Sequence, residues 1–202
     1  METSAVEQIY RVQVTPLPGE LRDDYLLNDI MALGIQDVAR VERHELYFLR
    51  GSLTEEEVSR LCRELLADPI TQRASWSIVG GRQQPSSTPA GARRVEVGLL
   101  PGVTDSVAEN IMARASLLGI SGLQAAASAQ SYLLYRRDPS RKLDKATVQT
   151  IVKRLLCNEV IQYYELGWLA PHVGADLSAT EPRAEMVPVR NLNDQALLCL
   201  SR

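Results

Sequence analysis

One pattern of helix caps and apolar positions occurs twice in this chain, and it restricts the fold more than any other feature. In LTEEEVSRLCRELLADP, Thr54 and Glu57 form a capping box, which marks the start of a helix. The apolar stripe of that helix recurs in the second half of the chain, with Asp144 in the place of Thr54. The two stripes are Val58, Leu61, Cys62, Leu65 and Leu66, and Val148, Ile151, Val152, Leu155 and Leu156.

Other segments recur in the same order. Leu-Pro-Gly turns at 17–19 and 100–102 each follow a short alternating apolar run. The helix exits LLADPITQ and LLCNEVIQ also correspond. The offset between corresponding positions grows along the chain, as insertions in the first helix and in the loop between the hairpin and the second helix would produce. We therefore predict that the chain is a tandem duplication of one unit.

Each unit is predicted to have the order β-α-β-β-α-β. In the first, IYRVQV alternates as a strand does, and a helix follows that ends at Gly34. We interpret IQDVARVERHELYFLRG as two strands joined by a polar hairpin around Glu42–His44. Pro69 ends the next helix, and TQRASWSIV is the last strand.

The second unit repeats this order. Thr104 or Asp105 caps its first helix, which ends at Gly119. LQAAASAQSYLLYRR is interpreted as two strands, Asp144 caps the second helix, and VIQYYELGW closes the unit.

The predicted fold class is α+β, with split β-α-β repeats. The repeats are 1–79 and 93–169, the linker is 80–92, and 170–202 is a tail in which a helix begins. Such a unit leaves one sheet face without helices. We expect the two copies to cover each other about a pseudo-two-fold axis as an internal dimer, with further oligomerisation left open.

Composition argues against several classes of protein. A net charge of −3, a pI of about 5.5 and the lack of a basic stripe disfavour nucleic-acid binding. No apolar run approaches the length of a membrane span, so we expect no membrane contact and a cytoplasmic location. Cys62 and Cys157 fall in apolar helical stripes, where reduced cysteine acts as a small hydrophobe.

The residue patterns of enzymes are also missing. His44 and His172 have no carboxylate or cysteine at metal-ligand spacing, and no nucleophile or phosphate-loop motif occurs. We therefore expect no catalytic, cofactor-binding or metal-binding residues in this chain. The basic segment Arg136–Lys145 is interpreted as a solvated loop in preference to an anion or partner contact.

The turns and helix exits resemble the PurS family, the small subunit of phosphoribosylformylglycinamidine synthase. Members typically show Leu-Leu-x-Asn-Pro-Val at this exit. Leu65–Ile70 has Asp68 for the Asn and keeps Pro69, whereas 155–160 keeps Asn158 and has Glu159 for the Pro. The resemblance covers about 10–79 and 93–168.

The tail LNDQALLCLSR is similar to the opening helix of the large synthetase subunit, PurL. That likeness suggests the front of a fused small-plus-large subunit polypeptide, or a fragment of one.

The resemblance implies a non-catalytic component of an ATP- and glutamine-dependent C–N ligase in purine biosynthesis. Such a subunit bridges a glutaminase (PurQ-like) and a synthetase (PurL-like) subunit and supports ammonia transfer between them. ATP and Mg²⁺ are expected in the synthetase. The expected partner contacts are the family-like turns and exits: Pro18, Gly19, Asp68, Pro69, Pro101, Gly102 and Asn158.

Two alternative functions are associated with folds of the same β-α-β-β-α-β order. A tandem ACT-like module would bind amino acids between its units, but its Gly-rich turn is only weakly matched by Pro18-Gly19 and Pro101-Gly102. An RNA-recognition module would need paired aromatic residues on its central strands. Here Tyr47 and Phe48 supply them in one copy and Tyr132 alone in the other, so we disfavour it.

Overall fold

A single antiparallel sheet organises the molecule. The computed structural model describes residues 6–17, 23–81, 88–174 and residue 195. Its six strands lie in the order β3-β1-β2-β5-β4-β6. They are β1 (Gln8–Pro16), β2 (Val38–Gly51), β3 (Gln72–Ile78), β4 (Ala92–Leu99), β5 (Leu123–Arg136) and β6 (Gln162–Glu165).

Two α-helices belong to each half of the chain, and the second of each pair ends in a π-helical turn. They are α1 (Asp24–Ala32), α2 (Glu55–Leu61) with η1 (Cys62–Leu66), α3 (Ser106–Leu117), and α4 (Lys145–Ile151) with η2 (Val152–Leu156). Within the described ranges, no helix has the length and apolar content needed to cross a membrane.

The local signals for helix ends are confirmed. Thr54 and Glu57 form the predicted capping box, and Asp144 accepts a hydrogen bond from the backbone N–H of Thr147. Asp105, rather than Thr104, caps α3. Gly34 follows the last turn of α1 with φ +83°, a conformation that glycine adopts without strain.

The predicted hairpin around Glu42–His44 is wrong. β2 runs without interruption over 14 residues and pairs along its length with β5, which is also one strand where two were predicted. Each half is therefore β-α-β-α-β. Glu42 and His44 are not turn residues: they point to the helix-free face of the sheet, where both are buried. Charged residues at alternate strand positions were thus mistaken for a polar turn.

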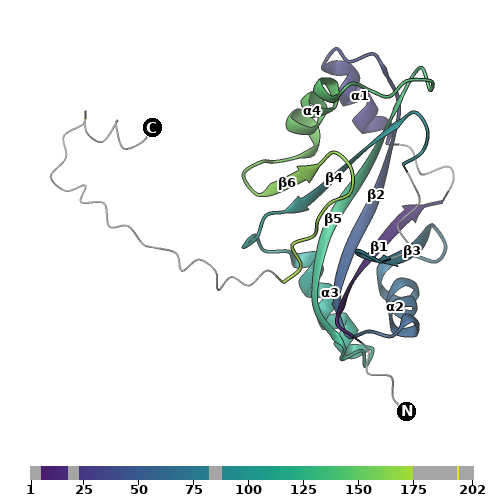
Figure 1. The fold of residues 1–202 in the computed structure, drawn as a ribbon, viewed down its shortest axis with the longest axis vertical. Coiled ribbons are helices and arrows are strands. Elements are labelled where there is room, and N and C mark those ends of the chain that lie inside the picture. Colours follow the sequence, from purple (N-terminus) through teal and green to yellow (C-terminus); the bar gives the residue numbers. More distant parts are fainter. Residues whose placement is uncertain (1–5, 18–22, 82–87, 175–194, 196–202) are drawn as a thin grey trace.

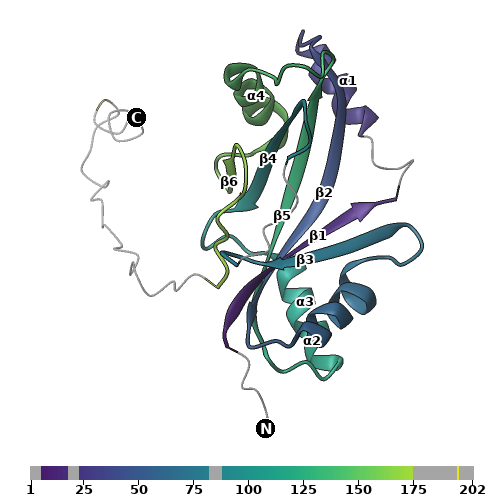
Figure 2. The same ribbon diagram turned by 45° about the vertical axis from the view of Figure 1, so that its right-hand side comes forward.

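The helices are exchanged between the halves. Figures 1 and 2 show α1 beside α4 at one end of the sheet and α3 beside α2 at the other. One core cluster joins Val58, Leu61 and Cys62 of the first half to Ile111 and Ala115 of the second. The other joins Ile30 of α1 to residues of α4 and η2 and to Cys157, which follows η2. Each core is therefore built from both halves, and Cys62 and Cys157 are buried free thiols, as predicted.

The strand registers of the two halves correspond. Pro16 pairs with Gln72 in the first half. Leu99 pairs with Gln162 in the second half. Pro16 and Leu99 each come directly before a Leu-Pro-Gly turn, and Gln72 and Gln162 each end a helix exit. The pairing of β1 with β3 is therefore repeated in β4 and β6 at the positions that the sequence comparison makes equivalent.

The central pair of strands follows the same relation. Arg11 pairs with Phe48, and its counterpart Arg94 pairs with Leu133, the counterpart of Phe48. Glu45 of β2 lies opposite Gln130 of β5. Gln130 is the counterpart of Glu45, because the two are as far apart in the sequence as Phe48 and Leu133. A position therefore pairs with its own counterpart at the middle of the sheet, as a local two-fold arrangement requires.

The two halves meet edge to edge, through β2 and β5, and do not cover each other's bare faces as predicted. Face-to-face packing needs two apolar faces, but here the helix-free face carries charged residues, including Arg11, Arg94 and Glu96. Part of that face is covered by the segment after β6, seen in yellow-green in front of the sheet in Figure 1.

Candidate partner-binding site

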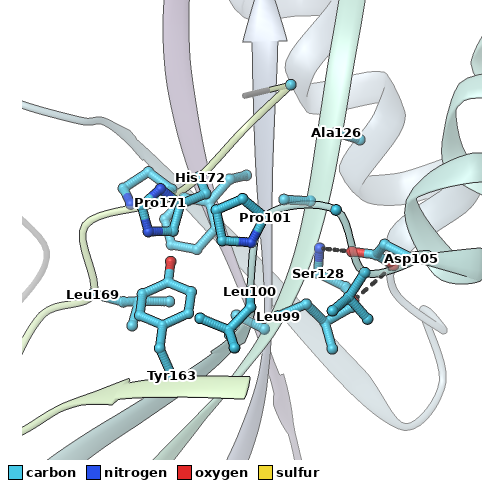
Figure 3. A pocket seen from close by; sticks show the side chains of 17 residues that line it. Leu99, Leu100, Pro101, Asp105, Ala126, Ser128, Tyr163, Leu169, Pro171 and His172 are labelled. Carbon is cyan, nitrogen blue, oxygen red and sulfur yellow. Dashed lines mark hydrogen bonds between the residues drawn. The ribbon is translucent and has the colours of Figure 1, made fainter. Parts of the chain in front are cut away.

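A cavity of about 250 Å³ lies where β4 ends beside β5. β4 stops at Leu99, and Gly98–Ala129 is the last residue pair between these strands. The residues of β5 before Ala129 therefore have no β4 partner. The turn at Pro101 forms one wall of the space, as Figure 3 shows.

The Pro101–Gly102 turn is held in a defined shape. The N–H of Val103 donates to the carbonyl of Leu100 at 3.1 Å, and Gly102 has φ +85°. Proline second and a positive-φ glycine third is the geometry of a type II turn. Both turn residues are exposed at the mouth of the cavity.

Asp105 joins this turn to the open edge of β5. Its Oδ1 caps Ala108 at the start of α3 at 2.9 Å. Its Oδ2 accepts the backbone N–H of Ser128 at 2.6 Å, and the Ser128 hydroxyl donates to Oδ1 at 3.0 Å. Figure 3 shows this pair on one side of the cavity. The carboxylate is thus occupied by structural hydrogen bonds and serves to position the turn.

The opposite wall comes from the segment after β6, which we call the strap (Leu166–Gly174). The Tyr163 hydroxyl donates to the carbonyl of Ala170 at 2.8 Å, and the Tyr163 ring lies 4.7 Å from the His172 ring between centroids. Burial raises the pKa of the Tyr163 hydroxyl, so it stays a donor at neutral pH. Leu169 and Val173 pack onto the sheet with Phe48.

The strap is anchored by buried charges at the middle of the sheet. Arg11 donates two hydrogen bonds to Glu96, at 2.5 and 2.9 Å, and Arg94 donates a third at 3.3 Å. The backbone N–H of Leu169 donates to the same carboxylate at 2.8 Å. The Trp168 ring lies 4.7 Å from the Arg11 guanidinium and 4.0 Å from that of Arg94. Stacking of this kind stabilises a partly desolvated cation.

The residues predicted as partner contacts have different positions. Pro101 and Gly102 line the cavity, whereas Pro18 and Gly19 lie outside the described residues. Asp68 and Asn158 build matching turns before β3 and β6. In each turn the side chain accepts the N–H of the residue two positions on, and a glutamine closes the turn from β3 or β6. Pro69 is exposed in the first of these turns.

The second half of the chain also matches a known family. Residues 92–169 fit the family model described as PurS: Phosphoribosylformylglycinamidine (FGAM) synthase. We refer to this matched region, residues 92–169, as the PurS domain. This match contains β4 to β6, the cavity turn and the strap residues up to Leu169. A search of the curated proteins returns no match.

Sequence reasoning missed the strap and the charges beneath it. The segment ELGWLAPHV, which runs from the end of the PurS domain into the residues after it, has no helix or strand period, and we assigned the part from Ala170 onward to a tail. Trp168, one of two tryptophans in the chain, was the available signal, because a large aromatic residue in an unpatterned segment usually packs against something.

The cavity beside the PurS turn is suited to binding a protein segment. Its walls are mostly backbone and apolar side chains, and one strand edge is open. Among the described residues that line it, Asp105 is engaged in capping, and His172 packs on Tyr163 with no acid beside it. Such walls favour an apolar side chain or an added strand.

Proposed function

We propose that this chain acts as the PurS component of FGAM synthase, with both halves serving as PurS-like units. In this role it does no chemistry itself. It bridges a glutaminase and an ATP-dependent synthetase and supports the transfer of ammonia between them. ATP and Mg²⁺ would bind to the synthetase. The observation that carries the proposal is the PurS domain, which points to FGAM synthase and purine biosynthesis.

The first half supports the proposal through its correspondence to the PurS domain. The order of elements, the strand registers and the caps recur at equivalent positions of the two halves. The Asx turns at Asp68 and Asn158 recur as well. We infer that the two halves arose by duplication and stand in for a dimer of separate PurS subunits.

Reconstitution tests the bridging role. The chain is mixed with a glutaminase and a synthetase of this enzyme, and complex formation is followed by size exclusion. Glutamine-dependent and ammonia-dependent FGAM formation are measured separately. We expect one complex and a glutamine-dependent rate that requires the chain. Indifference of both rates to the chain would refute the proposal.

Variants at exposed turns locate the contacts. Pro101→Glu places a charge at the mouth of the cavity, and Pro69→Glu places the same charge at the exit of η1. If the cavity receives a partner segment, Pro101→Glu weakens assembly by about tenfold, equivalent to about 1.4 kcal/mol. Pro69→Glu then reports whether the helix exit is a second contact. Normal assembly by both variants would remove these turns from the interface.

The ACT-like alternative predicts a different result. A tandem of that type would be stabilised by one amino acid, which a thermal-shift screen would detect as a higher Tm. It would not associate with either synthase subunit.

A further inference from the structure

A second cavity, of about 390 Å³, lies at the other end of β4. β6 pairs only with Glu96–Leu99, so Ala92–Val95 have no strand partner on that side in the described part of the chain. The chain leaves the sheet edge at Gly167, whose φ of +147° suits glycine, and continues as the strap. We call the space that remains the β4 notch. Its volume is in the range of small-molecule sites.

Among the described residues, the lining of the β4 notch includes four cationic side chains and no carboxylate. Arg93 and Arg94 come from β4, Lys142 from the basic segment, and Lys145 from the first turn of α4. Thr88 adds a hydroxyl. In a chain with a net charge of −3, four cations around one cavity form a distinct positive region.

In the described part of the chain, the nearby carboxylates Asp144 and Glu96 form no ion pair with Arg93, Lys142 or Lys145. Asp144 is held by the N–H and hydroxyl of Thr147, at 2.8 and 2.5 Å. Glu96 is shared between Arg11 and Arg94, so one buried carboxylate serves two buried guanidinium groups. Arg94 is 6% exposed, and its Nε has no hydrogen-bond partner among the described residues. Burial lowers the pKa of Arg94, which is the effect of a cation that lacks full compensation.

The region of the first half that corresponds to the β4 notch has a neutral residue where the notch has Arg93. Tyr10 donates through its hydroxyl to the carbonyl of Leu53 at 2.6 Å. At the equivalent position, Arg93 donates through Nε to the carbonyl of Leu143 at 2.7 Å. Equivalent carbonyls thus accept a hydrogen bond from equivalent strand positions, but the donor is a neutral tyrosine in the first half and a cationic arginine in the second.

Two more replacements distinguish the two places, and the first of them adds positive charge in the second half. Lys145 stands where the first half has Glu55, and Leu166 stands where it has Trp76, which packs edge-on against Tyr10. β3 also pairs with β1 further along than β6 pairs with β4, and so closes the edge that the notch leaves open. The fold that both halves share therefore does not require the cations.

We propose that the β4 notch is a binding site for a phosphate-class anion, either free phosphate or the phosphate of an ester. Lys142 and Lys145 supply exposed ammonium groups, Arg93 a guanidinium edge, and Thr88 a hydroxyl donor. Buried Arg94, which follows Arg93 on β4, adds positive charge to the lining. Charge-assisted hydrogen bonds of this type are the strong ones in phosphate recognition.

Calorimetric titration of the full chain tests the site, with ionic strength held constant by chloride. The probes are inorganic phosphate, ribose 5-phosphate and hexaglutamate. The test variant is Lys142→Gln/Lys145→Gln. The matched control is Arg114→Gln/Arg154→Gln, which removes two exposed cations of the same domain that lie outside the notch. Circular dichroism checks that both variants are folded.

We expect saturable phosphate binding at one site, weakened at least tenfold in the test variant and less than twofold in the control. Binding of either phosphate probe supports the proposal, and their relative affinities identify free phosphate or an ester as the ligand. Failure of both to bind overturns it, as does equal weakening in the control. Binding of hexaglutamate alone overturns it in favour of an acidic peptide. None of these outcomes depends on assembly with synthase subunits.

Discussion

At the scale of single residues, the buried charged side chains on the helix-free face hold the strap on the sheet. Arg11 and Arg94 occupy corresponding positions in the two halves and converge on one carboxylate, Glu96. In the sequence these residues are merely the polar members of alternating strands. Nothing in that alternation shows that the polar side is buried, because burial depends on the strap, which comes much later in the chain than Glu96.

Glu96→Gln should destabilise the chain strongly. The amide keeps the shape of the side chain but leaves two buried guanidinium groups without a negative partner, which costs about 3–5 kcal/mol. Urea unfolding followed by circular dichroism measures the loss. Glu109→Gln, at an exposed position of α3, is the control and should change stability by less than about 0.5 kcal/mol. Equal stability of the two variants would contradict the role assigned to Glu96.

The acid limb of the stability curve should depend on Glu42. Burial raises the pKa of this carboxyl, but the nearby His44, the Tyr135 hydroxyl at 3.0 Å and Arg40 at 3.0 Å outweigh that effect and lower it. A carboxyl with a lowered folded-state pKa stabilises the fold above its unfolded pKa. This stabilising contribution is lost as the pH falls through the pKa of the carboxyl in the folded state.

Glu42→Gln should therefore cost on the order of 1 kcal/mol at pH 7 and flatten the decline of stability below about pH 4. Urea titrations at a series of pH values test this. A variant whose stability declines as steeply in acid as that of the parent chain would show that Glu42 is not responsible.

At the scale of elements, helices were predicted better than strands. Helix caps and apolar stripes are local, so Thr54, Asp144 and Gly34 could be placed from sequence alone. The long strands β2 and β5 were each divided in two, because the partner of each is the other, far away along the chain. A run such as Glu42–Glu45 becomes a strand only through that partner. The Pro101–Gly102 turn was found from sequence, but the cavity beside it needed the strap.

The backbones at Gly51 and Gly122 lie very close together at one end of β2, and a substitution of Gly51 tests this contact. A Cβ added to Gly51 would lie 2.1 Å from the carbonyl oxygen of Gly122, which is backbone and cannot move aside easily. Gly51→Ala should therefore cost at least about 3 kcal/mol by overpacking. Gly34→Ala meets no atom within 4 Å and should cost about 1 kcal/mol for its positive φ. Thermal or urea unfolding of both variants compares the two costs, and equal costs would contradict the close approach.

At the scale of the whole molecule, the exchanged helices make the two halves dependent on each other. A duplication was predicted from sequence, but the edge-to-edge joining of the halves and the exchange of helices were not. Both depend on how the units meet, which the pattern within one unit does not specify. The face-to-face expectation failed because it ignored the charge on the helix-free face.

Separated halves should not fold alone. Residues 1–81 would lack Ile111 and Ala115 for one core, and residues 88–202 would lack Ile30 for the other. Each expressed alone should show little fixed tertiary structure by near-UV circular dichroism. Co-expression should restore a stable one-to-one complex. Cooperative unfolding of either isolated half would contradict shared cores.

The strap also sets how the sheet would respond to tension. A pull on Gly174 would not peel β6 from the sheet edge one hydrogen bond at a time. It would act first on Arg50, whose guanidinium holds the Gly174 carbonyl, and then on the Leu169 contact with Glu96. The load would thus enter at Arg50 of β2 and Glu96 of β4 before it reached the hydrogen bonds of β6. A force applied through Gly174 would therefore be resisted by side chains of the sheet's interior strands before it reached the β4–β6 edge.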